Sequence, residues 1–182
     1  MSNKLLLTIN EWQKLFIELS FDEGRRLTVY KDSKGIPTVG IGFNLRANKT
    51  FPIIGRRISK IGEQITDKEC NQLFQWSLEN VALTPIEKYL LDGYNTLSDI
   101  RKRALINLCF NMGISTLLDF RNSLYYLFKG DYSKSADNFK KSKWYRQVKG
   151  RGDRITDMIR DETISKDYKS FAKQNFPEII YP

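Results

Sequence analysis

Residues 21–45 read FDEGRRLTVYKDSKGIPTVGIGFNL, and this stretch decides the fold of the chain. Gly24 stands where a helix would end, because glycine readily adopts the left-handed conformation that closes helices. Residues 27–29 and 37–43 alternate in polarity as two short strands would. Residues 31–35 between them are turn formers that finish on a glycine. The stretch therefore predicts a helix end followed by a small antiparallel sheet.

This arrangement places two carboxylates and a hydroxyl on three separate elements. Glu23 lies at the helix end, Asp32 at the tip of the hairpin and Thr38 at the start of the returning strand. Glycoside hydrolysis needs two acidic groups that flank one bond, one to protonate the leaving oxygen and one to handle water or the sugar. An ordinary interpretation also stands, in which Glu23 is a local cap and Asp32 a common turn aspartate.

Composition excludes several other chemistries. The 182 residues, 41% hydrophobic and 13% aromatic, can form one domain, or two small lobes that share a core. The chain has no histidine, which removes Ser-His-Asp and Cys-His mechanisms. Cys70 and Cys109 lie in apolar helical patterns and are predicted to be buried free thiols rather than a disulfide. Since they are too few for a zinc site, we expect no metal and no cofactor, and proton transfer falls to carboxylates.

Charge and hydropathy limit the kinds of partner and the cellular compartment that the chain can have. The net charge of +9 indicates an anionic partner, and nucleic acid, an anionic membrane surface and the bacterial cell wall all qualify. The apolar runs are shorter than the ~20 residues that a membrane span requires. Leu5-Leu6-Leu7 is too short for the apolar part of a signal peptide. We therefore expect no transmembrane segment and no signal peptide.

Capping boxes and glycines divide the rest of the chain. Thr8-x-x-Glu11 and Thr66-x-x-Glu69 each precede an apolar helical pattern. We predict one domain over 1–182, made of an N-terminal helix over 9–22, a β-lobe over 24–65, a linking helix over 67–83, a helical lobe over 84–170 and a tail over 171–182. Within the β-lobe, a third strand and a short helix fit residues 46–65 equally well.

Several helices are predicted within the helical lobe. Thr84-Pro85 would restart a helix with proline in its first turn, and Ser98 opens a helix whose middle is apolar almost all round and therefore buried. Further helices are expected near 115–129, 132–142, 144–148 and 152–161, with Gly113 and Gly130 as stops.

The spacing of the polar groups matches a known pattern. Eight residues separate Glu23 from Asp32 and five separate Asp32 from Thr38, within the motifs DEG-x-RL-x-x-YKD-x-x-G and T-V-G-I-G. A second block follows in the right order, with RKRALINLCFNMG at 101–113, FRNS at 120–123 and KSKWY at 141–145. The chain resembles the phage-type lysozymes, the endolysins of the T-even kind, over about residues 13–168. This resemblance implies an α+β lysozyme-like fold, in which a long helix joins a small antiparallel β-sheet lobe to a larger all-helical C-terminal lobe.

The resemblance also implies an activity. It would be a muramidase that hydrolyses the β-1,4 bond between N-acetylmuramic acid and N-acetylglucosamine in peptidoglycan, with inversion. Glu23 would be the general acid, Asp32 would position or deprotonate the attacking water, and Thr38 would hold that water. Inversion requires carboxyl groups roughly 6.5–9.5 Å apart, and we predict that separation for Glu23 and Asp32.

The same resemblance assigns substrate-binding residues. Arg151 matches the arginine that pairs with the catalytic glutamate. Sugar contacts map to Asn44, Phe110, Ser123 and Asn138, and Asn111 lies next to Phe110. For Phe110, plain core packing is an equal alternative.

Three positions depart from the family pattern. Phe43 stands where the best-known relatives have histidine, and Ser77 stands at the position of its acidic partner. We expect apolar packing to replace that ion pair, a change that is often neutral or stabilising. Asn44 stands where an apolar residue is usual.

The resemblance finally suggests a setting, which is a monomeric endolysin without a nucleic-acid partner. It would stay in the host bacterial cytoplasm until a holin-dependent route releases it to the periplasmic wall. Residues 140–154 hold seven basic residues and one acid beside Trp144 and Tyr145. Such a run can be a solvated helix face, a wall-binding surface or a nucleic-acid patch. Alternatives for the whole chain are a catalytically idle wall-binding module, a lytic transglycosylase and a basic nucleic-acid-binding protein.

Overall fold

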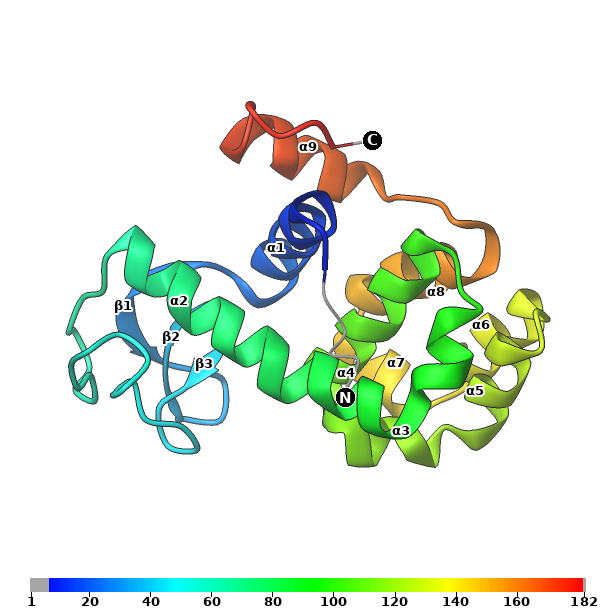
Figure 1. Cartoon of the computed structure of the whole chain (residues 1–182), viewed down its shortest axis with the longest axis horizontal. Coiled ribbons are helices and arrows are strands. Elements are labelled where there is room, and N and C mark those ends of the chain that lie inside the picture. Colours follow the sequence, from blue (N-terminus) through cyan, green and yellow to red (C-terminus); the bar gives the residue numbers. More distant parts are fainter. Residues whose placement is uncertain (1–6, 182) are drawn as a thin grey trace. The chain divides into compact units, whose positions relative to one another are not determined.

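The computed structural model describes residues 7–181 and shows an α+β protein with two compact units (Figure 1). One unit comprises Glu18–Asn80, and the other comprises the chain before and after it. Leu5, Leu6 and Pro182 lie outside the described residues. Helix α1 (Ile9–Glu23) begins at the predicted capping box, in which the Glu11 carboxylate accepts from the Thr8 N–H and the Thr8 hydroxyl accepts from the Glu11 N–H.

The smaller unit contains the predicted antiparallel sheet. Strands β1 (Arg26–Lys31), β2 (Pro37–Gly40) and β3 (Phe43–Asn44) lie in that order. The register pairs Tyr30 with Thr38 and Thr38 with Asn44. Directly paired residues project from the same face of a sheet, so these three side chains form one row across it. Val39 and Phe43 pair on the opposite face and are buried.

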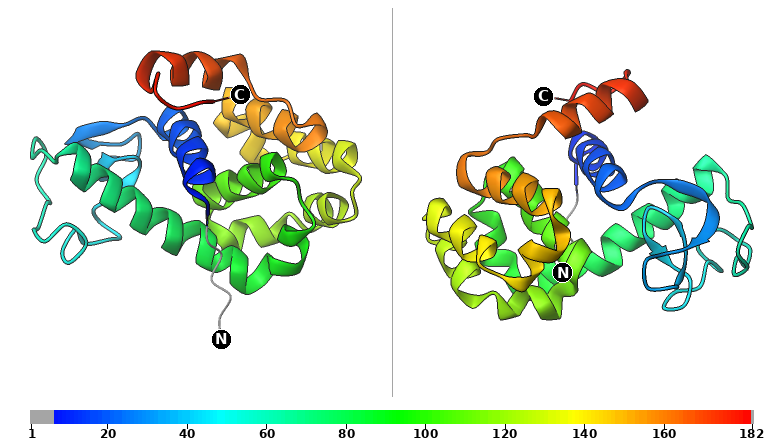
Figure 2. Two further views of the ribbon diagram at one scale, coloured as in Figure 1. Left: turned by 45° about the horizontal axis from the view of Figure 1, so that its top comes forward. Right: turned by 180° about the vertical axis from the view of Figure 1, so that it is seen from behind.

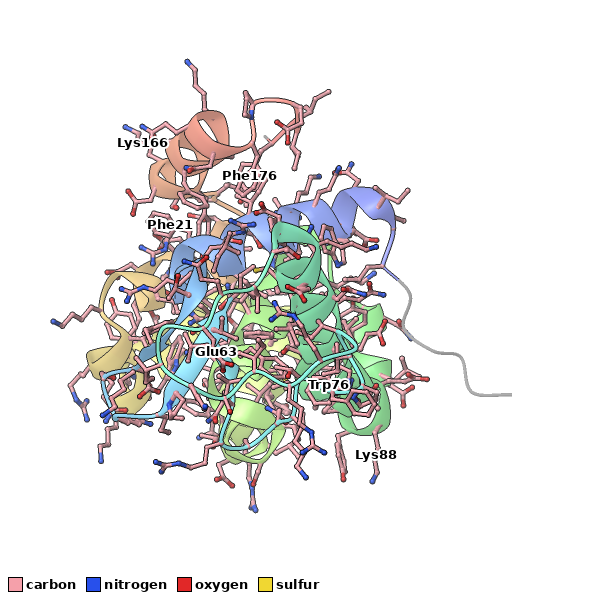
Figure 3. All side chains as sticks on the ribbon, turned by 90° about the vertical axis from the view of Figure 1, so that its left-hand side faces the viewer. Phe21, Glu63, Trp76, Lys88, Lys166 and Phe176 are labelled. Atoms are coloured by element: carbon pink, nitrogen blue, oxygen red, sulfur yellow. The ribbon has the colours of Figure 1, made fainter. Side chains whose placement is uncertain are left out.

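The segment 46–65 is neither the short helix nor the third strand that its sequence allowed. It consists of turns, joined to β1 by an isolated bridge between Thr28 and Gln64. Gly55 and Gly62 have positive φ angles of 73° and 90°, which break any regular element here. The Glu63 carboxylate closes the segment by accepting from the N–H groups of Ser59 and Lys60 (Figure 3).

The linking helix differs in kind from its prediction. Helix α2 (Asp67–Ser77) starts at the predicted Thr66 capping box, but it continues as a π-helix, η1 (Leu78–Leu83), and then as α3 (Thr84–Asn95). Helix α3 begins at Thr84 with Pro85 in its first turn, as predicted, although it follows η1 without a break. Pro85 explains the irregularity because it has no N–H to donate to the carbonyl of Val81, four residues earlier. The Cys109 thiol donates to that carbonyl instead, at 3.5 Å.

Helices alone build the remainder of the larger unit. Ser98 caps α4 (Asp99–Asp119), whose buried middle confirms the prediction, and Gly113 interrupts it with φ 77° and ψ 157°. The predicted single helix over 115–129 is wrong, because the chain bends at Phe120 (ψ 47°) before the next helix begins. The helices that follow are α5 (Arg121–Phe128), α6 (Tyr132–Lys140), α7 (Lys143–Val148) and α8 (Gly150–Asp161).

A further helix, α9 (Lys166–Asn175), runs into what the sequence predicted as a tail. It lies beside the first half of α1 (Figure 1, Figure 2). The ring of Phe176 (Figure 3) packs edge-on against Phe16 at 5.5 Å and Phe171 at 5.9 Å, and Phe16 stacks on Trp12 at 5.1 Å. This aromatic cluster ties the end of the chain to α1.

The cysteines and the hydropathy agree with the sequence. Cys70 and Cys109 are free and buried, as predicted, and burial raises the pKa of Cys109 to about 12. Such a thiol is almost wholly protonated at neutral pH and suits a packing role. Within residues 7–181, every helix is too short or too polar to cross a membrane.

Candidate active site

Asp32 is held at the hairpin tip by its own turn. Its Oδ1 atom accepts from the N–H groups of Lys34 and Ile36, both at 2.8 Å. Its carbonyl accepts from the N–H of Gly35 at 2.9 Å. These bonds fix the carboxylate through one oxygen, and Oδ2 makes no hydrogen bond within the described residues. A half-buried carboxylate with one such oxygen can orient a water molecule and accept its proton.

Thr38 is tied to the same turn through the carbonyl of Ile36. That carbonyl accepts from the backbone N–H of Asp32 and from the Thr38 hydroxyl, each at 3.0 Å. Because the Thr38 proton is committed to this bond, its oxygen can act toward a water molecule only as a hydrogen-bond acceptor. One peptide unit thus sets the positions of two of the predicted catalytic residues.

Glu23 is the last residue of α1, and a close turn of the sheet unit lies against it. Gly24 follows with a φ of 75°, which ends the helix as the sequence predicts. A Cβ atom placed on Gly42 would lie 3.4 Å from Glu23 Oε2. Gly42 also has a φ of 69°, so it gives the turn its conformation and leaves room for the carboxyl group.

Tyr30 lies within electrostatic reach of both carboxylates. Burial raises its pKa, the nearby Arg26 opposes this, and the charges of Glu23 and Asp32 raise the pKa further. The Arg26 guanidinium lies 4.3 Å from the centre of the Tyr30 ring. Tyr30 pairs with Thr38 in the sheet, so the tyrosine that feels the charges of Glu23 and Asp32 is also the strand partner of Thr38.

Asn44 completes the row that Tyr30 and Thr38 begin. Its amide oxygen accepts from the N–H groups of Arg46 and Ala47, both at 2.9 Å. Its amide nitrogen makes no hydrogen bond to the rest of residues 7–181 and can donate to a ligand. The predicted sugar contact at Asn44 therefore has a donor beside Thr38.

Comparison with known proteins gives this geometry a context. The family model described as phage lysozyme matches residues 21–163. The chain belongs to the phage lysozyme family. It is 33% identical over 160 residues to the protein named "Probable T4-type lysozyme 1" of Dictyostelium discoideum, which covers 81% of this chain and 94% of that protein.

Two further relatives show the same domain in different settings. "Probable T4-type lysozyme 2" of Dictyostelium discoideum is 33% identical over 164 residues, 83% of this chain and 95% of that protein. The "Pre-baseplate central spike protein Gp5" of Enterobacteria phage T4 is 33% identical over 150 residues, 76% of this chain but 26% of that protein. Membership of this family supports a lysozyme-like peptidoglycan hydrolase, a glycoside hydrolase.

Arg151, predicted to be the arginine that pairs with Glu23, belongs to the larger unit and is 6% exposed. Its Nε and Nη2 atoms both donate to Oδ1 of Asn107, at 2.9 Å and 2.7 Å. Asn107 is fully buried on α4, so a core side chain fixes the direction of the guanidinium. Its predicted pairing with Glu23 stays a prediction.

The other predicted sugar contacts lie in the larger unit, with different degrees of access. Phe110 and Asn111 are half-buried on α4, and the Asn111 amide oxygen accepts from the indole N–H of Trp144 at 2.8 Å. Asn138, half-buried on α6, donates to the carbonyl of Lys134. Ser123 is 3% exposed, which leaves little of its hydroxyl for a ligand.

The family position occupied by Phe43 is apolar here, as predicted. Phe43 is 2% exposed, and its ring meets the Trp76 ring edge-on at 5.8 Å. Ser77 is also buried. Aromatic packing between β3 and α2 therefore fills the place of the ion pair.

The basic run 140–154 is partly committed to the helical core. Trp144 is buried, the Tyr145 hydroxyl donates to the Asp153 carboxylate, and Lys140 lies 3.9 Å from Asp157. Four of the run's cations remain exposed, namely Lys141, Lys143, Arg146 and Lys149. This pattern is typical of a solvated helix face.

Three features of the site escaped sequence reasoning. Tyr30 looked like a strand residue, although its place between Glu23 and Asp32 in the motif was a usable signal. The Ile36 carbonyl acts through its backbone, which no side-chain pattern reveals. Asn107 is separated from Arg151 by 44 residues, so tertiary packing alone brings them together.

Proposed function

We propose that the protein is an N-acetylmuramidase that hydrolyses the β-1,4 bond between N-acetylmuramic acid and N-acetylglucosamine. The observation that supports this proposal is the shared Ile36 carbonyl, which accepts from the Asp32 N–H and the Thr38 hydroxyl and so holds both residues at one turn. The charge of Glu23 acts on Tyr30, the strand partner of Thr38. Two acids on separate elements are what cleavage of a glycosidic bond requires.

In the proposed reaction Glu23 donates its proton to the glycosidic oxygen as the bond to the anomeric carbon breaks. A water molecule held by Thr38 and Asp32 attacks that carbon, and Asp32 takes the proton that the water loses. One water is consumed, and one new reducing end is formed. A lytic transglycosylase would instead form an anhydro sugar and would have no use for the ordered Asp32–Thr38 pair.

Loss of turbidity tests this proposal with purified Gram-negative peptidoglycan or outer-membrane-permeabilised cells. The wild type should clear the suspension, and Glu23→Gln should lower the rate by about 10²–10⁴-fold, the usual contribution of a general acid. Glu178→Gln, which neutralises an exposed carboxylate of the tail, is the matched control. A wild type that binds peptidoglycan without releasing reducing ends would make the protein the idle wall-binding module instead.

Bond choice and stereochemistry have their own measurements. Mass spectrometry of borohydride-reduced fragments should find muramitol at the new ends, and anhydro sugars should be absent. Proton NMR during the first minutes should detect the α-anomer, because water attacks from the face opposite the leaving group. Retention would instead indicate carboxyl groups about 5 Å apart and a covalent intermediate.

The biological setting is part of the same proposal. A positively charged hydrolase suits attack on the anionic bacterial cell wall. An endolysin would reach that wall by a holin-dependent route. The relatives named lysozyme come from Dictyostelium and the phage relative is named a spike protein, so host lysis is tested separately from the chemistry. Expression in bacteria with and without a holin tests it, since lysis should require the holin.

A further inference from the structure

A pocket of about 250 Å³ opens in the smaller unit, next to the proposed catalytic strands. It is lined by Leu45, Asn48, Lys49, Thr50, Arg57, Ile58 and Ser59. These residues belong to the turns after β3, the segment that sequence patterns left unassigned. None of them has a place in the proposed chemistry.

The pocket wall is held in place by one buried side chain. Thr50 is 2% exposed, and its hydroxyl donates to the carbonyl of Arg56 and accepts from the N–H of Ile58, both at 2.8 Å. Asn48 is anchored on the other side, because its N–H donates to the carbonyl of Asn44 at 3.0 Å. The segment is therefore a built structure, although it contains no helix or strand.

The charge of this segment has one sign. Residues 46–60 contain five cations and no acid. Arg56 is committed to Glu69 through two hydrogen bonds, but Lys49 and Arg57 line the pocket, are exposed and make no ion pair within residues 7–181. Two such cations beside the apolar Leu45 and Ile58 suit a small anionic group that carries an alkyl part.

The pocket begins next to Asn44, the last residue of the row formed by Tyr30, Thr38 and Asn44. The N–H of Leu45 donates to the carbonyl of Pro37, the residue before Thr38. Asn44 pairs directly with Thr38, and neighbouring strands lie about 4.8 Å apart. The pocket thus lies beside the strand that pairs with Thr38, and the polymer bound at Thr38 is the source of ligand that we consider for it.

We propose that this pocket binds the peptide stem of peptidoglycan through a carboxylate of the stem. The stem is attached to N-acetylmuramic acid and carries free carboxylates and alanine methyl groups. Lys49 and Arg57 would pair with a carboxylate, and Leu45 and Ile58 would contact a methyl group. This inference rests on the proposed muramidase activity and extends it from the glycan to the peptide.

Two substrates separate peptide recognition from glycan cleavage. One is intact purified peptidoglycan, and the other is the same material after an amidase has removed the peptides. The Lys49→Glu/Arg57→Glu double variant should lose about tenfold or more in kcat/KM on intact peptidoglycan through KM, with kcat unchanged. On the peptide-free glycan it should match the wild type within about twofold. Lys68→Glu, which reverses an exposed cation of α2 outside the pocket, is the charge control.

A direct titration tests binding without turnover. Full-length Glu23→Gln protein is titrated by NMR with the dipeptide Ala-D-Glu, with its diamide and with inorganic phosphate. The dipeptide should shift the resonances of residues 45–59, and the diamide should not. A stronger response to phosphate than to the dipeptide would overturn the proposal and indicate a phosphate-bearing wall polymer instead.

The kinetic outcomes are equally distinct. An equal loss on both substrates, or a double variant that matches Lys68→Glu on intact peptidoglycan, would overturn the peptide-stem assignment while the muramidase proposal stands. A wild type inactive on both substrates would overturn the muramidase proposal, and the dipeptide titration would then still decide the pocket. Thermal unfolding of each variant identifies any loss that comes from misfolding.

Discussion

The two units hold their polar site residues in different ways. In Glu18–Asn80, Asp32 and Asn44 are fixed by backbone N–H groups two to four residues away. In the larger unit the comparable bonds join distant elements, with Arg151 and Asn107 44 residues apart and Trp144 and Asn111 33 apart. The difference predicts whether a substitution changes the activity or the stability of the protein. Substitution of a polar site residue in the smaller unit should alter chemistry with little loss of stability, and substitution of one in the larger unit should lower the stability of the fold.

The largest expected effect breaks the chemistry and keeps the turn. In Asp32→Asn the amide oxygen can still accept from Lys34 and Ile36, but the group can no longer take a proton from water. Activity should fall by about 10²–10⁴-fold. The melting temperature followed by circular dichroism should change by less than about 2 °C. A large fall in melting temperature would show that the charge of Asp32, and not only its oxygen, holds the hairpin.

The matching test in the larger unit is Asn107→Ala. It removes the acceptor of two Arg151 N–H groups in a buried environment, which should lower the free energy of unfolding by about 3 kcal/mol. Urea denaturation measures this loss. Asn122→Ala, at an exposed position of α5, is the control and should be neutral. Equal midpoints for the two variants would remove the contrast between the units.

Two glycines sharpen the comparison. Alanine at Gly42 must adopt a left-handed φ and approach Glu23 Oε2, so we expect a loss of about 1–2 kcal/mol together with lower activity per folded molecule. Alanine at Gly93 would place its Cβ 2.5 Å from the Phe128 ring, which should cost about 1–3 kcal/mol with no change in activity per folded molecule. Chemical denaturation and active-site-normalised rates distinguish them. An unchanged rate in Gly42→Ala would show that Glu23 tolerates the contact.

The smallest expected effect is a pH dependence in the smaller unit. The side-chain hydrogen bond from Arg56, with bonds from Thr66, lowers the pKa of Glu69 to about 2. The unfolded chain holds this carboxyl near 4.3, so its stabilising contribution is present above that pH and is lost as the pH falls toward 2. Glu69→Gln should therefore show a shallower loss of stability between pH 4.5 and 2 than the wild type. Identical slopes would mean that solvent screens the Arg56–Glu69 pair.

Local sequence signals predicted the parts of the fold that depend on neighbouring residues. Both capping boxes, the helix end at Gly24 and the turn around Asp32 form from contacts within a few positions. The signals failed where distant groups intervene. The helix after Thr66 continues through Pro85 because Cys109 from α4 donates to the carbonyl that the proline leaves open. Helix α9 runs into the predicted tail because Phe176 packs against Phe16 of α1, which is far away in the sequence.

The sequence by itself determined the helix, strand, turn and strand over residues 9–44, the absence of histidine chemistry and the spacing that puts Glu23, Asp32 and Thr38 on consecutive elements. These follow from backbone preferences and composition, which act locally. The tertiary structure alone decided that Tyr30, Thr38 and Asn44 share one row, that Asn107 holds Arg151 and that the unpatterned turns after β3 enclose a basic pocket. Strand register and side-chain packing are set by burial and hydrogen bonding between residues far apart in the chain, and no local pattern encodes them.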